Sequence, residues 1–208
     1  MQTDSLILHS EKALELFPNQ AMLWFYNGTG HLMQKNAAKA VKSLEYGKKL
    51  AADNAELQTQ FNMQLGDGYQ HLKDYPKSEE AYESVLVADP DNTHVLNNYS
   101  YYLSLRNQSL NKAKSMSEKL VRQYPKDATY LDTYAWVLYK LKDYNNSRKY
   151  LEEAIAIKKD ADVLEHYGDV LYQLDEKDKA VEQWIKAKSL GKGSEFIDKK
   201  IKDKKLYE

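Results

Sequence analysis

Two glycine pairs have the spacing that comes nearest to a phosphate-binding loop. They lie in Gly28-Thr29-Gly30 and in Gly66-Asp67-Gly68. A loop that cradles phosphate with its backbone N–H groups usually has a third glycine and follows a β-strand, and both features are missing here. The two pairs also fall at the same phase of a repeat described below. That position favours glycines that let two helices pack closely.

The histidines could serve as metal ligands or as acid–base groups. None of them has the spacing of a metal-binding motif, and none lies with a nucleophile in a recognised motif. Cysteine is absent, which excludes disulfides, thiolate metal sites and cysteine nucleophiles. The sequence therefore predicts no catalytic residue, no metal site and no cofactor. A rival class stays open, a hydrolytic enzyme assembled from the carboxylates of the groove described below, and stabilisation by a metal would favour it. The histidines are His9, His31, His71, His94 and His166.

The composition is that of a globular chain without a strong charge bias. Of 208 residues, 42% are hydrophobic and 29% are charged, which is enough to bury a core. Lys plus Arg number 30 and Asp plus Glu 31, so the basic excess typical of nucleic-acid binders is missing. No apolar run approaches the roughly 18 residues that span a bilayer, and the first residues lack the basic region of a signal peptide. We expect a soluble chain with no nucleic-acid partner and no membrane insertion.

Small and apolar residues recur with a period of about 34 residues, which predicts a repeat architecture. One column of such residues lies before the closing turn of each repeat, with successive spacings of 34, 38, 35, 34 and 33 residues. Prolines follow this column by five residues at positions 18, 90 and 125. The column consists of Ala13, Gly47, Val85, Leu120, Ala154 and Ala187.

A second column of small residues marks the other half of each repeat, with larger residues three positions after and four positions before it. Offsets of three and four place these residues on one helical face, so each repeat is predicted to be two helices. Asp74 and Asp143 are suited to cap the second helix. Residues 134–139 could also be read as a buried strand, but the repeat register predicts a helix. The column consists of Gly28, Gly66, Ser100, Ala135 and Gly168.

These features resemble the tetratricopeptide-repeat (TPR) family. The stretch 164–171 (LEHYGDVL), followed by Ala180, Trp184 and Ala187, is similar to its 34-residue signature. The chain departs from the pattern at His31, Gly47 and Asn62. Residues 96–104 and 130–141 also resemble the C-terminal repeats of bacterial envelope-associated TPR proteins. The resemblance implies an all-α, right-handed solenoid of antiparallel helix pairs that acts as a protein-interaction scaffold and not as an enzyme.

The register divides the chain into five repeats with an additional helix at each end. Residues 1–18 are expected to be the second helix of a truncated repeat, and 193–208 a C-terminal capping helix. The repeats are expected at 19–53, 54–91, 92–126, 127–160 and 161–192.

The two end helices differ in how well they cover their apolar residues. The first leaves part of an apolar face uncovered, so we expect a piece of a longer protein and possible self-association. The last carries Phe196, Ile197 and Ile201 on one stripe and five lysines on the predicted solvent side. The alternative for these lysines is a patch for anionic partners. The apolar residues of the first helix are Leu6, Leu8, Leu14 and Phe17, and the lysines are Lys199, Lys200, Lys202, Lys204 and Lys205.

In TPR proteins the first helix of each repeat lines the concave face, so the resemblance implies a binding groove there. Tyrosine and tryptophan are common anchors of recognition surfaces. A rival interpretation is that Tyr101, Trp136 and Tyr139 pack against neighbouring first helices, while Trp184 is expected in the core. The predicted peptide-binding residues are Phe25, Thr29, Met63, Asp67, Gln70, Asn97, Asn98, Tyr101, Asp132, Trp136, Tyr139, Glu165, Asp169 and Tyr172.

The charges of this groove predict the kind of partner. Its acidic positions, Asp132, Glu165 and Asp169, stand where TPRs that grip a C-terminal carboxylate have Lys or Arg. An acidic, aromatic groove favours a basic or amide-rich peptide, whose backbone Asn97 and Asn98 could bind. The alternative function is a structural spacer or self-association module without a peptide ligand. The compartment is not determined by the sequence. The resemblance implies the periplasmic or envelope-associated part of a longer bacterial protein.

Overall fold

The computed structural model describes residues 2–191 and 193–207, with the side chains of 3–191 and 193–207. Within these residues the chain forms twelve α-helices and no strand, which confirms the all-α fold class. Residues 130–140 lie in a helix, so the strand interpretation is wrong. The helices are α1 (Gln2–Leu16), α2 (Ala21–Met33), α3 (Ala37–Leu50), α4 (Ala55–His71), α5 (Tyr75–Ala88), α6 (Thr93–Leu105), α7 (Leu110–Gln123), α8 (Ala128–Lys140), α9 (Tyr144–Ile157), α10 (Ala161–Gln173), α11 (Lys177–Ser189) and α12 (Ile197–Asp203).

One tight turn joins the two helices of each repeat. In the fourth repeat, the N–H of Asp143 donates to the carbonyl of Leu138 at 2.9 Å, which is the six-to-one bond of a Schellman turn. The same Asp143 then caps α9, because its carboxylate accepts from the N–H of Asn146. Asp74 caps α5 in the same way, so both predicted caps are confirmed. Each of these turns has a residue with positive φ, and the third repeat has a second one, Ser109 (44°); the others are Lys35 (60°), Lys73 (62°), Asn107 (54°), Lys142 (64°) and Asp175 (63°).

Glycines in the middle of the first helices let the paired helices approach closely. A Cβ added to Gly168 would lie 2.4 Å from Nε1 of Trp184 and 3.0 Å from the carbonyl oxygen of Ala180. A Cβ on Gly66 would lie 2.4 Å from the ring of Tyr82. Both rings are fully buried, which confirms Trp184 as a core residue. Helix packing therefore explains these glycines without a phosphate ligand.

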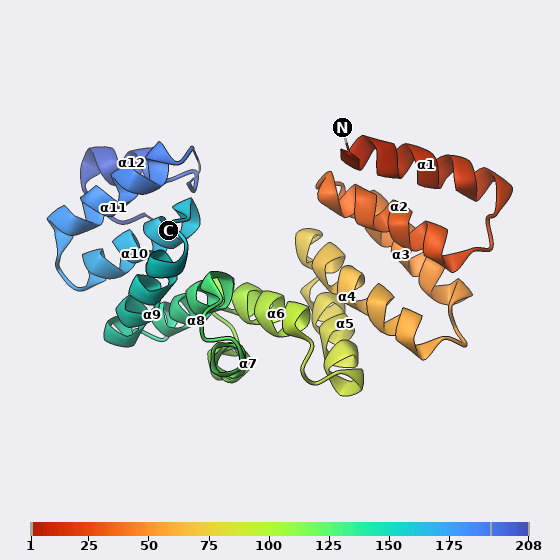
Figure 1. Cartoon of the computed structure of the whole chain (residues 1–208), viewed down its shortest axis with the longest axis horizontal. Coiled ribbons are helices and arrows are strands. Elements are labelled where there is room, and N and C mark those ends of the chain that lie inside the picture. The colour runs from red at the N-terminus through yellow and green to blue at the C-terminus, as the bar shows by residue number, and fades with distance from the viewer. Residues whose placement is uncertain (1, 192, 208) are drawn as a thin grey trace. The chain divides into compact units, whose positions relative to one another are not determined.

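The chain divides into two compact units, which we describe separately: unit 1 runs up to Val95 and unit 2 begins at Leu96. In unit 1, each of α1 to α4 packs against the next helix, and α2 also contacts α4 (Figure 1). In unit 2, each of α7 to α11 packs against the next helix, and α8 also contacts α10. Contacts between alternate helices bring the first helices of successive repeats side by side. We call the surface that they form within each unit the first-helix face.

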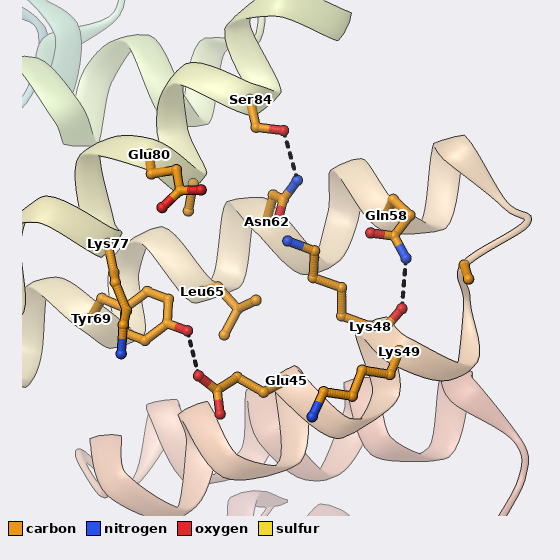
Figure 2. A pocket seen from close by; sticks show the side chains of 12 residues that line it. Glu45, Lys48, Lys49, Gln58, Asn62, Leu65, Tyr69, Lys77, Glu80 and Ser84 are labelled. Carbon is orange, nitrogen blue, oxygen red and sulfur yellow. Dashed lines mark hydrogen bonds between the residues drawn. The ribbon is translucent and has the colours of Figure 1, made fainter.

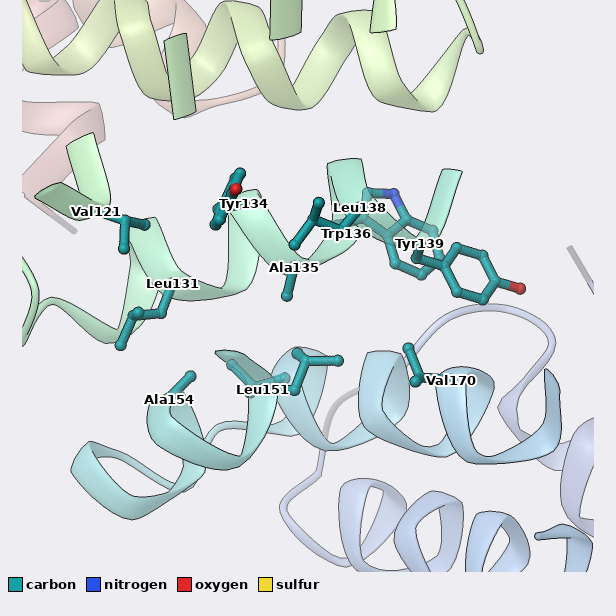
Figure 3. Packing of buried hydrophobic residues seen from close by; sticks show 11 residues of the cluster. Val121, Leu131, Tyr134, Ala135, Trp136, Leu138, Tyr139, Leu151, Ala154 and Val170 are labelled. Carbon is teal, nitrogen blue, oxygen red and sulfur yellow. The ribbon is translucent and has the colours of Figure 1, made fainter. Parts of the chain in front are cut away.

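The largest buried cluster surrounds α8. Figure 3 shows Leu131, Ala135 and Leu138 directed from α8 toward the neighbouring helices, where Leu151 of α9 and Val170 of α10 lie. Each of these five side chains is at most 1% exposed. The apolar face of α8 is therefore covered by the helix that follows it and by the next first helix.

The first helix, α1, covers only part of its apolar side. Ile7 is buried, and its side chain lies against Gly30 of α2. Leu6 and Leu14 are half-buried, whereas Leu8 and Phe17 are exposed. Among the described helices, none combines the length and the apolar character required to cross a bilayer.

Candidate functional site

In unit 1 the predicted ligand residues lie on α2 and α4 and are all half-buried. Phe25 and Met63 are apolar members of this group, and Phe25 meets the core ring of Phe61 edge-on at 5.4 Å. Asp67 accepts from the Tyr82 hydroxyl at 2.5 Å and lies 2.7 Å from Nε2 of His94. Its carboxylate is therefore engaged within unit 1, and a ligand cation would compete with these bonds.

Two other predicted residues of unit 1 have a buried polar atom without a hydrogen-bond partner. These atoms are Oγ1 of Thr29 on α2 and Oε1 of Gln70 on α4. A buried polar group without a partner costs free energy, so such atoms usually bond to protein, water or a ligand. Both atoms can accept a hydrogen bond, and both belong to the first-helix face.

In unit 2 the predicted aromatic residues on α8, Trp136 and Tyr139, are buried. Trp136 is 6% exposed and stacks on Tyr139 at 4.7 Å and on His166 of α10 at 4.1 Å between ring centroids. The ammonium of Lys140 lies 4.7 Å from the Trp136 ring. The contact with His166 agrees with the rival interpretation, in which these aromatics pack against neighbouring first helices. Tyr172 on α10 in turn stacks on Trp184 of the core.

One edge of Trp136 nevertheless remains without a partner. Its Nε1 is buried and donates no hydrogen bond to any described residue. Figure 3 shows this nitrogen on the side of the indole away from Leu151 and Val170. On α6, Oδ1 of Asn97 is likewise without a partner, while its amide nitrogen donates to Asn98 at 3.1 Å. Unit 2 therefore contains a donor and an acceptor on predicted residues that are buried and have no hydrogen-bond partner among the described residues.

His166 connects α10 to α8 through Asp132. Its Nδ1 lies 2.8 Å from the Asp132 carboxylate, and its ring stacks on Trp136. Burial acts to lower the pKa of His166, but the carboxylate of Asp132 and, more weakly, Asp169 and Glu165 outweigh it and raise the pKa. The charged form of His166 is therefore favoured beside Asp132, and in that form it pairs with the carboxylate of this predicted acidic residue.

The carboxylates of Glu165 and Asp169 are also bonded within the chain. Nζ of Lys200, on α12, donates to Glu165 Oε1 at 2.9 Å and to both oxygens of Asp169 at 2.8 Å. Ser194 donates its backbone N–H and its hydroxyl to Glu165, and Trp184 donates its indole N–H to Asp169. The two carboxylates are 4% and 2% exposed. They do not present open acidic positions to a ligand.

This arrangement corrects one expectation about the C-terminal helix. Lys200 was predicted on the solvent side of α12, but it is 3% exposed and points inward. The physical reason is the pair of buried carboxylates on α10, whose burial is tolerated only when a cation lies beside them. The other lysines of α12 and its C-cap, Lys199, Lys202 and Lys204, are exposed as predicted.

The two carboxylates differ in their pKa shifts. Burial raises the pKa of Asp169 to about 6, although Lys200 acts in the opposite direction. Burial also acts to raise the pKa of Glu165, but the hydrogen bonds from Ser194 and Lys200 outweigh it and lower the pKa. Glu165 is therefore the residue that is ionised over the wider pH range.

These groups meet in one pocket of about 570 Å³, which we call the Trp136 pocket. It brings together four of the predicted residues of unit 2 and adds residues that the sequence did not predict, several of them from the C-terminal segment. Asn97, Asn98, Asp132, Tyr139 and Tyr172 do not line it. The lining residues are Tyr101, Leu105, Trp136, Lys140, Asp162, Glu165, His166, Asp169, Gly193, Ser194, Phe196, Lys200 and Tyr207.

A second pocket of the same volume lies in unit 1, between α3, α4 and α5. Figure 2 shows Asn62 of α4 in this pocket, with its amide nitrogen donating to Ser84 at 2.9 Å. Tyr69 donates its hydroxyl to Glu45 on the other side. None of the predicted ligand residues lines it. Asn62, where the chain departs from the repeat pattern, lines this pocket.

Comparison with known proteins identifies the repeat. The sequence model of the tetratricopeptide repeat matches residues 128–160, and no curated protein matches the chain. A tetratricopeptide repeat protein from Parabacteroides merdae is similar in structure, with a TM-score of 0.77 and 15% identity over 98% of this chain and 78% of its own.

Two further structures have the same fold. PilF of Pseudomonas aeruginosa has a TM-score of 0.69 and 18% identity over 89% of this chain and 86% of its own. A chain of the APC/C hetero-tetramer Cut9–Hcn1 has a TM-score of 0.82 and 12% identity over 97% of this chain and 39% of its own. TPR proteins are in general scaffolds for protein–protein interaction. Residues 128–160 are therefore a tetratricopeptide repeat, and the chain has the fold of the tetratricopeptide-repeat family.

Proposed function

We propose that this chain is a scaffold that binds extended, amide-rich segments of a partner protein, and that the first-helix face of each unit binds its own segment. In unit 2, a carbonyl oxygen of the bound segment enters the Trp136 pocket and accepts the indole N–H. The observation that carries this proposal is the set of unpartnered polar atoms on predicted ligand residues. They are Oγ1 of Thr29, Oε1 of Gln70, Oδ1 of Asn97 and Nε1 of Trp136.

The chemistry of these atoms matches a peptide backbone. Thr29, Gln70 and Asn97 offer acceptors for N–H groups, and Trp136 offers a donor for a carbonyl. Leaving such a group buried and unpaired costs about 1–3 kcal/mol, so a ligand that supplies the partners recovers part of that free energy. An amide group carries both a donor and an acceptor. This supports amide-rich ligands over purely hydrophobic ones.

The charges support an amide-rich segment more than a basic one. Glu165 and Asp169 already bind Lys200, and Asp132 lies beside His166. A lysine or arginine of the ligand would have to displace these partners. A neutral amide needs no such displacement.

Substitution of Trp136 by Phe tests the proposal. An aromatic ring that can still stack is kept while the donor and part of the indole are lost, whereas Trp136→Ala would open a larger cavity and cost about 3–5 kcal/mol of stability. Peptides are first selected against the full chain from a displayed random library. We expect Trp136→Phe to weaken their binding about fivefold, which corresponds to a net hydrogen bond of about 1 kcal/mol. Binding is measured by calorimetry, and folding by thermal unfolding.

Trp24→Phe is the matched control. Trp24 lies on α2 in unit 1, and its indole N–H already donates to the Pro18 carbonyl at 2.8 Å. Because this indole N–H is already bonded within the chain, its removal in Trp24→Phe should leave the peptide affinity unchanged. In spectra of the ¹⁵N-tryptophan-labelled chain, the peptide should shift the indole signal of Trp136 but not that of Trp24. Equal affinities of Trp136→Phe and wild type would show that no ligand carbonyl binds at the indole.

A further inference from the structure

We infer that Lys200 determines which charge of ligand the Trp136 pocket accepts: its ammonium fills a cation subsite that Glu165 and Asp169 form. The pocket thereby excludes a ligand ammonium and keeps the room beside Trp136 for a neutral group. The statement about ligands rests on the proposed function. The subsite itself can be tested without any peptide.

The hydrogen bonds of the subsite are complete. An ammonium has three donors, and Nζ of Lys200 contacts three carboxylate oxygens within 2.9 Å. The remaining Glu165 oxygen, Oε2, accepts from the Ser194 N–H at 2.7 Å. The Trp184 indole donates to Asp169 Oδ1 at 2.9 Å. This geometry would hold any primary ammonium of similar reach, because the donors and acceptors are matched in number and direction.

The subsite belongs to the ligand surface and not only to the packing of α12. Glu165 and Asp169 are first-helix positions, predicted as ligand residues from the repeat register, and both line the same pocket as Trp136. Lys200 is supplied by the same chain, so its effective concentration is far higher than that of a free lysine side chain. Two buried carboxylates without it would demand another cation. Lys200 therefore reverses the ligand preference that the first helices alone would have.

The local charge agrees with this role. Around the pocket, the acidic groups are Asp162, Glu165 and Asp169, and the basic groups are Lys140, Lys200 and the imidazole of His166. If Lys200 alone is removed, the negative charges of the pocket outnumber its positive charges, and the buried carboxylates of Glu165 and Asp169 lose their cation. The exposed lysine Lys202, on the same helix, does not line the pocket.

Chemical rescue tests the inference. Lys200→Ala should lose stability, because two buried carboxylates lose their cation, and n-butylammonium should restore it by binding in the vacated space. At a concentration about tenfold above its dissociation constant, the cation should raise the folding equilibrium constant about tenfold. In the ¹⁵N-tryptophan-labelled full chain, the indole signal of Trp184, bonded to Asp169, should shift saturably. The wild type should show neither effect, because Lys200 occupies the subsite.

Two controls separate a specific subsite from general charge effects. Butyltrimethylammonium has the same charge but no N–H donor, so it should not rescue Lys200→Ala. Lys202→Ala, with an exposed lysine removed, should be neither destabilised nor rescued.

If Lys200→Ala does not fold without added cation, Lys200→Met is used instead. Its side chain fills the space of the lysine stem, so the ammonium ion replaces n-butylammonium in that titration. Failure of the matching cation to restore its variant overturns the inference, and so does saturable binding of n-butylammonium to the wild type at Trp184. If rescue fails but a selected peptide still binds the wild-type chain through the Trp136 indole, the proposed function remains and only the inference about Lys200 is rejected. Absence of any peptide binder, with successful rescue, would reject the proposed function alone.

Discussion

At the scale of single residues, the carboxylate of Asp132 favours the charged form of His166. Its pKa is raised by Asp132 against the effect of burial. A histidine whose pKa is higher in the folded state stabilises the fold fully below its unfolded pKa of about 6.5, and this contribution is lost as the pH rises through the folded value. The free energy of unfolding should therefore decrease on raising the pH through that window.

Asp132→Asn should reverse the sign of this shift. The amide keeps a hydrogen-bonding group near Nδ1 but removes the charge, so burial dominates and the pKa of His166 should fall below about 6.5. Titration of the imidazole signals by NMR measures it. His94 is the internal control, because its pKa is raised by Asp67 in unit 1 and should not change. A His166 pKa that stays raised in Asp132→Asn would assign the shift to Glu165 and Asp169 instead.

The sequence predicted part of the site at this scale. Tyr101, Trp136, Glu165 and Asp169 were expected together from the repeat register, and all four line one pocket. The inward direction of Lys200 was missed, because it lies in a run of lysines that reads as a solvent-exposed face. Helical spacing could have predicted this direction, because Lys200 follows the buried Ile197 by three positions and so lies on the same face of the helix.

At the scale of helices, close approach of α10 and α11 depends on Gly168. Gly168→Ala should destabilise the chain, although alanine is the better helix former by about 1 kcal/mol. The new methyl would lie 2.4 Å from a fully buried indole and 3.0 Å from a backbone oxygen. Overpacking of this kind costs about 1–3 kcal/mol, so we expect a net loss in urea unfolding.

Gly68→Ala is the control for this prediction. Its Cβ would meet one methyl group of Val41 at 2.8 Å, and the next atom, on Leu32, is 3.6 Å away. A single side-chain contact can adjust more easily than a buried ring backed by a backbone oxygen. Gly168→Ala should therefore be the less stable variant, and a stability equal to that of wild type would show that α10 and α11 can separate without loss.

The helices themselves could be predicted well, for a physical reason. The pattern of small and large residues recurs in five repeats, and all five give the same helical register. This register resolves the choice between helix and strand at 134–139. The 38-residue spacing corresponds to one longer first helix, because α4 has 17 residues where the other first helices have 13. The conformation of the turns was not predicted, because lysine at Lys35, Lys73 and Lys142 gives no signal for positive φ.

At the scale of the whole molecule, the rival to peptide binding is association of the chain with itself. The exposed side chains of α1 and the residue after it support this rival, since Leu16 is 75% exposed and Phe17 58%. It predicts that the average mass in sedimentation equilibrium rises with concentration and that Leu16→Lys suppresses the rise. Val87→Lys is the control, because Val87 is 84% exposed on α5. Peptide affinity should be the same in both variants if ligand binding and association use different surfaces.

The turns between paired helices have a consequence for how stable such a chain can become. Five of these turn residues have a left-handed backbone conformation, which costs the lysines about 1–2 kcal/mol and costs asparagine and aspartate less; they are Lys35, Lys73, Asn107, Lys142 and Asp175. Glycine adopts that conformation freely, although it also gains entropy in the unfolded chain. Substitution by glycine at these five exposed positions is therefore a route to a higher melting temperature. None of the five is a predicted ligand residue, so such substitutions leave the proposed binding surface unchanged.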